Sequence, residues 1–238
     1  MISRHLMWAN WCKEVCIVQI RCFADNLEKR ILPTFESVSE EGNRIAEEAW
    51  KRFNESAGPD SDMESGAEWA SNQGFTHYRN LEDLQQGLLN FSAAFCYHLF
   101  EQQLLFFHRK ELLKPQEENN KTLFKPNVII KKFKEHGIAI KDFRSWLTID
   151  ELRQVANVVK HADGDAAERV KKLRPEMFTR PHMRDDEVLG EWFVSNPLPV
   201  YQPLFGEDFY VTIEDIRAYV MAVTDFWTEL ADILEQQQ

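Results

Sequence analysis

The sequence predicts an all-α fold, built as a helical bundle with long antiparallel helices at its centre. Over long stretches, apolar residues recur at three- and four-residue steps, the period of a helix with one buried face. The 238 residues include only 9 glycines and 9 prolines, so few positions force a turn. A hydrophobic share of 44% and an aromatic share of 12% are sufficient for a buried core. We therefore expect a single all-α domain over residues 1–238.

The N-terminal quarter of the chain predicts two helices. Residues 4–30 place apolar side chains on one helical face, which predicts a long buried helix. Pro33 interrupts this pattern because proline lacks the backbone N–H that a helix interior needs. Residues 34–56 predict a second, acidic amphipathic helix, and the stretch SAGPDSDMESG that follows predicts a loop.

The middle of the chain predicts the most hydrophobic helix, over residues 81–113. That stretch has no proline and a single glycine, so we interpret it as the central helix of the bundle. After a polar loop, residues 126–137 predict a short basic helix that ends at its glycine. Thr148 and Glu151 have the spacing of a capping box, so a further helix is expected to begin at Thr148.

The C-terminal third predicts two helices around an irregular segment. The stretch DGDAAERVKKLRP predicts a helix that ends at Pro175. Residues 198–211 contain two prolines and little helical period, and predict a short irregular segment or a hairpin around Gly206. Residues 213–235 predict a closing helix with Thr212 as its N-cap.

The charge of the chain is unevenly distributed. The formal net charge is −11, which argues against non-specific nucleic-acid binding by the whole surface. Residues 121–184, however, contain 15 Lys and Arg against 8 Asp and Glu. A basic middle in an acidic protein can be a binding surface for a polyanion or for an acidic surface of the same or another chain. The alternative is a solvated surface that binds nothing.

The cysteines and the N-terminal stretch indicate a reduced, cytoplasmic protein. No CxxC pair or His/Cys cluster appears, so we interpret the cysteines as reduced buried thiols and expect no metal. The apolar stretch near the N-terminus is interrupted by charges and resembles neither a signal peptide nor a membrane span. We therefore expect a cytoplasmic location, no membrane contact and no cofactor.

The stretch TIDELRQVANVVKHADG carries the candidate site. Arg153, Asn157 and His161 are spaced i, i+4 and i+8, which places them on one stripe of the predicted helix, with Lys160 alongside. An imidazole can take a proton from a ribose 2′-hydroxyl or give one to a leaving oxygen. Arginine stabilises charge on a phosphate, and asparagine orients either group. The alternative is a solvated polar face.

The stretch ANVVKH, on a short helix after a long hydrophobic one, resembles the signature of HEPN domains. That resemblance implies an α-helical, usually dimeric protein, and many members of the family are metal-independent ribonucleases in toxin–antitoxin, CRISPR-associated and other antiphage systems. Asn157 matches the polar position of the signature and His161 its histidine. The arginine position falls on Ala156, so Arg153 would have to act from one turn earlier. The HEPN-like core would span about residues 80–165 together with the C-terminal helix.

His98 and Glu101 interrupt the apolar run of the central helix and share a face at i, i+3. Because a buried carboxylate must be paired or protonated, we expect Glu101 to pair with Arg153 or His161 across a helix interface and to orient the imidazole. Carboxylate-bridged di-iron bundles use Glu-x-x-His twice, whereas this is His-x-x-Glu once, which disfavours a metal. A solvated stripe and an enzyme of unrelated chemistry on this helix are the alternatives.

Two basic segments, IIKKFK and RVKKLR, supply candidate phosphate contacts. Lys131 and Lys132 belong to the first, Lys171 and Lys172 to the second, and Lys160 lies within the candidate site. Such side chains would contribute salt-sensitive affinity rather than chemistry. A plain solvated helix face is an equally good interpretation of each segment.

Two functions fit these observations. The first is a HEPN-like RNA-binding protein, a metal-independent ribonuclease of a toxin or antiphage system that acts as a homodimer. The second is a non-catalytic helical module that binds a protein partner or antitoxin, which Ala156 at the arginine position favours. Catalysis requires His161 to be exposed in a basic cleft, whereas a non-catalytic module can bury it or leave it isolated.

Overall fold

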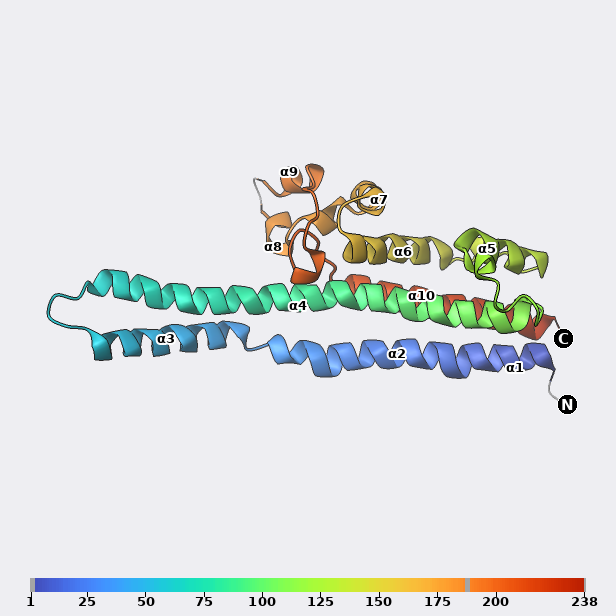
Figure 1. The fold of residues 1–238 in the computed structure, drawn as a ribbon, viewed down its shortest axis with the longest axis horizontal. Helices are drawn as coiled ribbons and strands as arrows, with labels where there is room; N and C mark the ends of the chain where they lie inside the picture. The colour runs from blue at the N-terminus through green and yellow to red at the C-terminus, as the bar shows by residue number, and fades with distance from the viewer. Residues whose placement is uncertain (1–2, 187–188, 238) are drawn as a thin grey trace.

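The computed structural model describes residues 3–186 and 189–237, and within these ranges it contains helices, turns and loops but no strand. The all-α prediction is confirmed (Figure 1). The helices are α1 (Arg4–Trp11), α2 (Ile17–Asn26), α3 (Val38–Ser56), α4 (Met63–Phe107), α5 (Pro126–Glu135), α6 (Trp146–His161), α7 (Asp165–Leu173), α8 (Pro181–Arg184), α9 (Gly190–Ser195) and α10 (Ile213–Gln236).

Helix α4 runs the length of the molecule (Figure 1) and begins 18 residues before the predicted start. Its N-cap is Asp62, whose carboxylate accepts hydrogen bonds at 3.1 Å from the backbone N–H groups of Glu64 and Ser65. With 45 residues, the helix is roughly 68 Å long at 1.5 Å per residue. The predicted loop SAGPDSDMESG is therefore confirmed over residues 57–62 and wrong over residues 63–66, because a capping aspartate begins the helix inside that stretch.

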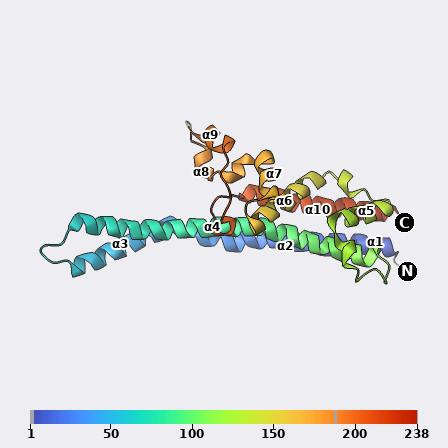
Figure 2. The same ribbon diagram turned by 45° about the horizontal axis from the view of Figure 1, so that its top comes forward.

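Helix α3 packs antiparallel on the first part of α4, and this pair (α3 with residues 63–80 of α4) forms an arm. The arm extends past the rest of the molecule in both ribbon views (Figures 1 and 2). Its helices approach closely: a Cβ atom added at Gly74 would lie 2.4 Å from the carbonyl oxygen of Gly42 and 2.8 Å from the Cβ of Ala46. Small residues thus let the two helices approach closely, and the ring of Phe53 packs over Gly66 near the tip of the arm.

The N-terminal helix is nearly continuous, as predicted over 4–30. Helices α1 and α2 are joined by a π-helical turn at Cys12–Cys16, and a second such turn at Leu27–Ile31 follows α2. Pro33 then lies in a 3-10 turn, so the interruption predicted there is observed, although α3 begins at Val38 rather than at 34. Three of the four cysteines are buried free thiols, whereas Cys22 is exposed, which corrects that part of the prediction.

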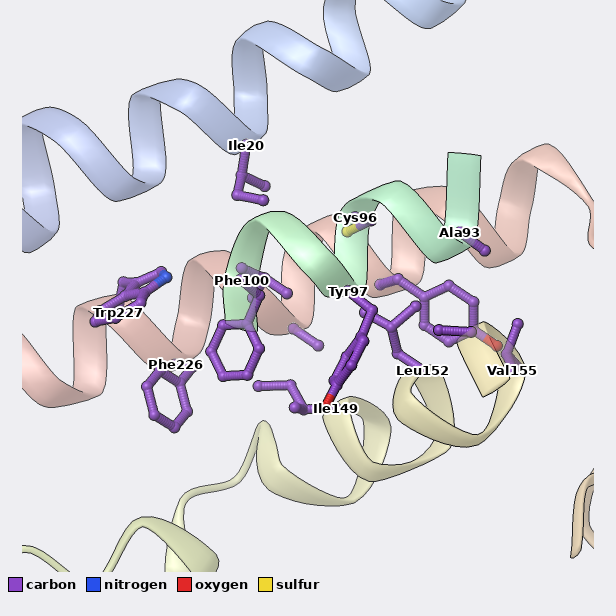
Figure 3. Close-up of a cluster of buried hydrophobic side chains, with 14 of the residues drawn as sticks. Ile20, Ala93, Cys96, Tyr97, Phe100, Ile149, Leu152, Val155, Phe226 and Trp227 are labelled. Atoms are coloured by element: carbon purple, nitrogen blue, oxygen red, sulfur yellow. The ribbon is translucent and has the colours of Figure 1, made fainter. Parts of the chain in front are cut away.

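The main core lies where α2, α4, α6 and α10 meet (Figure 3). Phe100 of α4 packs edge-on against Phe226 of α10, with ring centroids 5.0 Å apart. Tyr97, one turn earlier, points toward α6 (Figure 3). The two chain ends lie together at one end of the molecule, where the His5 ring and the carbonyl oxygen of Gln237 are 3.2 Å apart.

Residues 198–211 form an irregular segment with one 3-10 turn, Pro203–Phe205, and not a hairpin. The segment binds α4 through the fully buried Asn90, whose amide nitrogen donates to the carbonyl oxygens of Pro203 (2.6 Å) and Phe209 (2.7 Å). The amide oxygen of Asn90 accepts from the N–H of Val211 at 3.0 Å. Gly206 has a φ of +80°, and a Cβ there would lie 1.9 Å from a backbone oxygen of α4. One asparagine thus replaces the backbone pairing that a hairpin would have supplied.

We expect Asn90→Ala to lower the free energy of unfolding by about 3 kcal/mol, since several buried backbone groups lose their partner and each bond is worth roughly 1 kcal/mol. Urea unfolding followed by circular dichroism measures this. Asn54→Ala, at an exposed position of α3, is the control and should change the value by no more than about 0.5 kcal/mol. Equal stability of the two variants would contradict this description of the segment.

Candidate functional site

Helix α6 begins at Trp146, two residues before the predicted start. Its N-cap is Ser145, whose hydroxyl donates to a carboxylate oxygen of Glu229 on α10 at 2.9 Å. Thr148 lies inside the helix, so the capping box predicted for Thr148 and Glu151 was wrong. The spacing of Thr148 and Glu151 was misleading, because the contact of Ser145 with α10, which is distant in sequence, decides where α6 begins.

A cluster around Arg174 holds α6 in place. The guanidinium of Arg174 binds Glu151 of α6 (2.7 Å), Asp215 of α10 (2.6 Å) and Glu176. The hydroxyl of Tyr219 also donates to Glu151, at 2.8 Å. Burial alone would lower the pKa of Arg174, but the hydrogen bonds to Asp215 and Glu176 outweigh it and raise that pKa above its ordinary value. The cluster ties α6 to α10 and to the end of α7.

The predicted stripe lines one cavity at the C-terminal end of α6. Leu152, Val155 and Val159 are buried, so the opposite side of the helix faces outward. The cavity has a volume of about 310 Å³. Its lining comes from α6, from the turn after it and from α7: Arg153, Gln154, Asn157, His161, Ala162, Asp163, Gly164, Asp165, Ala166 and Arg169.

The imidazole and the amide of the stripe are available for a ligand. His161 is exposed and Asn157 is half-buried. In the part of the chain that the structure describes, neither side chain makes a hydrogen bond or an ion pair. Arg169 is exposed and also has no acidic partner among the described residues.

Arg153 reaches the same cavity but is already engaged. Its Nε and Nη2 atoms donate to one carboxylate oxygen of Asp150, at 3.0 Å and 2.7 Å. Ala156, where the HEPN signature has its arginine, is 1% exposed. A long charged side chain at position 156 would have to enter the core, whereas Arg153 lies on the outward side of α6 and lines the cavity.

The backbone is strained directly after the histidine. Ala162 has φ 60° and ψ −131°, a conformation that residues with a Cβ rarely adopt. Its neighbour Asp163 donates from its backbone N–H to the carbonyl oxygen of Val200 at 3.1 Å. The chain therefore turns sharply at the end of α6, and residues 162–164 of this turn line the cavity together with His161.

His98 and Glu101 form a separate pair. The Nδ1 atom of His98 lies 3.2 Å from Glu101, and the hydroxyl of Tyr97 donates to Glu101 at 3.3 Å. In the described structure Glu101 bonds to neither Arg153 nor His161, so the pairing expected across the helix interface is not formed. Glu101 instead lines a second cavity, which Arg153 also lines.

The α5 lysines lie apart from the His161 cavity. Lys131 and Lys132 are both within ion-pair distance of Glu135, at 3.8 Å and 3.4 Å. Neither lines the cavity. They can still attract a polyanion at long range, but not contact a phosphate held at His161.

Of the predicted lysines on α6 and α7, one forms ion pairs with carboxylates and two do not. Lys171 binds Glu168 at 3.0 Å and Asp163 at 3.5 Å, which neutralises it. Lys160 and Lys172 are exposed and have no acidic partner among residues 3–186 and 189–237. Among the described residues, Arg169 is therefore the unpaired positive charge that lines the cavity, whereas Lys160 and Lys172 are unpaired but not part of its lining.

Arg169, Asp163 and Asp165 line the cavity but were not among the predicted site residues. All three lie beyond the end of α6: Asp163 is in the turn, and Asp165 and Arg169 are in α7, whose direction depends on the conformation of Ala162. A charge count of the stretch could have found Arg169, yet its approach to His161 follows only from the turn. The two aspartates make the cavity mixed in charge rather than uniformly basic.

Within the described ranges, no group of three or more His, Cys, Asp and Glu side chains is arranged to hold a metal ion. None of the described helices combines the length and the apolarity that crossing a bilayer requires.

Comparison with protein-family models, with curated proteins and with solved structures finds no match to this chain.

We expect Ala162→Gly to raise the free energy of unfolding by about 1 kcal/mol, because glycine adopts this conformation without the strain of a Cβ. Thermal and urea unfolding measure the change. Ala156→Gly, in the buried interior of α6, should lower stability by about 1 kcal/mol or more. Destabilisation by Ala162→Gly would contradict the strained turn.

Proposed function

We propose that this chain is a HEPN-like RNA-binding protein whose site is the cavity at the end of α6. The observation that carries the proposal is that Asn157, His161 and Arg169 converge there, and that none of the three has a side-chain partner within residues 3–186 and 189–237. An imidazole, an amide and a guanidinium are the groups that recognise a ribose hydroxyl and a phosphate. Lys160 and Lys172 add positive charge on neighbouring exposed positions.

The same groups support metal-independent RNA cleavage. His161 accepts the proton of the ribose 2′-hydroxyl, and the 2′-oxygen attacks the adjacent phosphorus. The bond from phosphorus to the 5′-oxygen breaks, which leaves a 2′,3′-cyclic phosphate and a 5′-hydroxyl end. Asn157 orients the reacting groups, and Arg153 and Arg169 stabilise the charge on the phosphate.

The leaving 5′-oxygen needs a proton, and the cavity of one chain contains one imidazole. A homodimer that brings two such cavities together supplies the second. An apolar stripe on α4 supports self-association, since Phe91, Phe95 and Phe106 are each more than 40% exposed and large apolar patches mark interaction surfaces. We place this dimer in the cytoplasm, in a toxin or antiphage setting where a protein partner or antitoxin restrains it.

A non-catalytic interaction module is the second candidate, and two observations favour it. Asp150 neutralises Arg153, and the position of the signature arginine is buried at Ala156. The arm also exposes Trp69 and Phe75, aromatic residues of a type that anchors protein partners. If the chain is such a module, its helical fold serves to bind a protein partner, and His161 takes part in no reaction.

We expect induced wild-type protein to arrest growth and fragment cellular RNA. His161→Ala should reduce the cleavage rate of purified protein by about 100-fold or more, the usual contribution of a general base. His136→Ala is the matched control, because His136 is also exposed and also lies at the C-terminal end of a helix, but does not line the cavity. Cleavage is measured on labelled single-stranded RNA in the presence of a metal chelator.

If wild type and His161→Ala bind and cleave RNA equally, the cavity at the end of α6 is not the RNA site. If wild type binds RNA at this face without cleaving it, the catalytic half of the proposal fails and RNA binding stands.

We expect Asp150→Asn to raise RNA affinity by about tenfold, because it frees Arg153 for a phosphate and a charge-assisted hydrogen bond is worth roughly 1.5 kcal/mol. Fluorescence anisotropy with a labelled RNA whose 2′-hydroxyls are methylated measures binding without cleavage. Asp142→Asn removes an exposed carboxylate without a partner in the described chain, and should leave the affinity nearly unchanged. An Asp150→Asn affinity equal to that of Asp142→Asn would show that Arg153 takes no part.

A further inference from the structure

A second cavity lies between α4, α5 and α6, and its volume is about 310 Å³. Most of its wall is apolar and is built by the rings of Phe100, Phe124 and Trp146 together with aliphatic side chains such as Leu104 and Ile130. Small-molecule sites begin at about this volume and combine an apolar wall with a few convergent polar groups. This wall is suited to contact a flat ligand group that is apolar or aromatic.

The polar groups of this cavity gather where α4 meets α6. Glu101 comes from α4, and Asp150 and Arg153 come from α6. Burial raises the pKa of the neighbouring Tyr97 above its ordinary value, so this phenol is neutral and donates its hydrogen to Glu101. Two carboxylates therefore face one guanidinium, which leaves an excess negative charge.

Lys141 also lines the cavity, from the loop between α5 and α6, and it is exposed. Its long flexible stem lets the ammonium stay in water, so it is not bound to the carboxylates as Arg153 is. Among the described residues, Glu101 accepts a hydrogen bond from Tyr97 and lies beside His98, and no Lys or Arg is within ion-pair distance of it. The charge that complements this end of the cavity is positive.

Arg153 is common to both cavities. It lines this one beside Asp150 and Glu101, and it lines the other beside Asn157 and His161. Its two hydrogen bonds to Asp150 hold it toward Asp150. A cation that binds Asp150 would compete with Arg153 and leave the guanidinium free to turn toward His161.

We propose that this cavity binds a small amphipathic amine, with its ring against the apolar wall and its ammonium between Glu101 and Asp150, and that this binding releases Arg153 to the His161 cavity. The first half stands on the cavity alone, and the second half rests on the proposed RNA site.

The binding half is tested by calorimetry with 2-(1-naphthyl)ethylamine as the probe. Two analogues share its ring: 2-(1-naphthyl)ethanol, which is neutral, and 1-naphthylacetate, which is anionic. We expect the amine to bind at least about tenfold more tightly than the alcohol, and the anion more weakly than either. Equal binding of the three, tighter binding of the anion, or no binding of the amine up to its solubility limit would overturn the proposal.

Variants locate the ammonium. Glu101→Gln keeps the shape of the side chain and removes its charge, so it should weaken amine binding about tenfold and leave the alcohol unaffected. Asp142→Asn is the matched control, because Asp142 is a carboxylate next to Lys141 that does not line the cavity. Thermal melting confirms that both variants are folded. An equal effect of the two variants would place the amine elsewhere.

The regulatory half is tested with the methylated RNA in the absence and presence of saturating amine. We expect RNA affinity to rise about tenfold in wild type, and not in Arg153→Ala. A rise of equal size in both would overturn the release of Arg153. If the amine binds as expected and wild type binds no RNA, the proposed function fails while the amine site stands.

Discussion

The packing of α6 between α4 and α10 decides which of its side chains face outward, and the candidate site follows from that packing. Leu152 and Val155 enter the core shared with α4 and α10 (Figure 3), so the stripe of Arg153, Asn157 and His161 lies on the other side. Arg174 fixes this orientation by binding carboxylates of α6 and α10. Loss of this packing would turn the stripe and separate it from the α7 residues that complete the cavity.

The fold class and the stripe could be predicted because both depend on helical period, which is local. The buried residues of α6 and α10 repeat at three- and four-residue steps, and the i, i+4, i+8 spacing places the stripe residues at one cavity. The start of α4 could not be predicted, because Gly66 and Gly74 weaken the helical signal locally. They are required by the close approach of α3, a contact that the sequence pattern does not show.

The electrostatics of the site depend on which of several local pairs form and on the backbone turn after His161. Glu101 binds Tyr97 and His98 rather than His161, although the i, i+3 pair itself is formed. The proximity of Asp163, Asp165 and Arg169 to His161 depends on the strained turn at Ala162, and no propensity predicts that turn. The Asp150–Arg153 pair has ordinary i, i+3 spacing and is the feature of the site that the sequence could have indicated.

Hydrogen–deuterium exchange with and without a single-stranded RNA carrying 2′-O-methyl groups tests most directly whether the end of α6 is an RNA site. Such an RNA cannot be cleaved through its 2′-oxygen, so it stays bound during labelling. We expect protection concentrated in residues 153–173, which include the stripe, the turn after it and α7, with exchange in the arm unchanged. Protection confined to the arm, or none at RNA concentrations that saturate binding, would contradict this expectation.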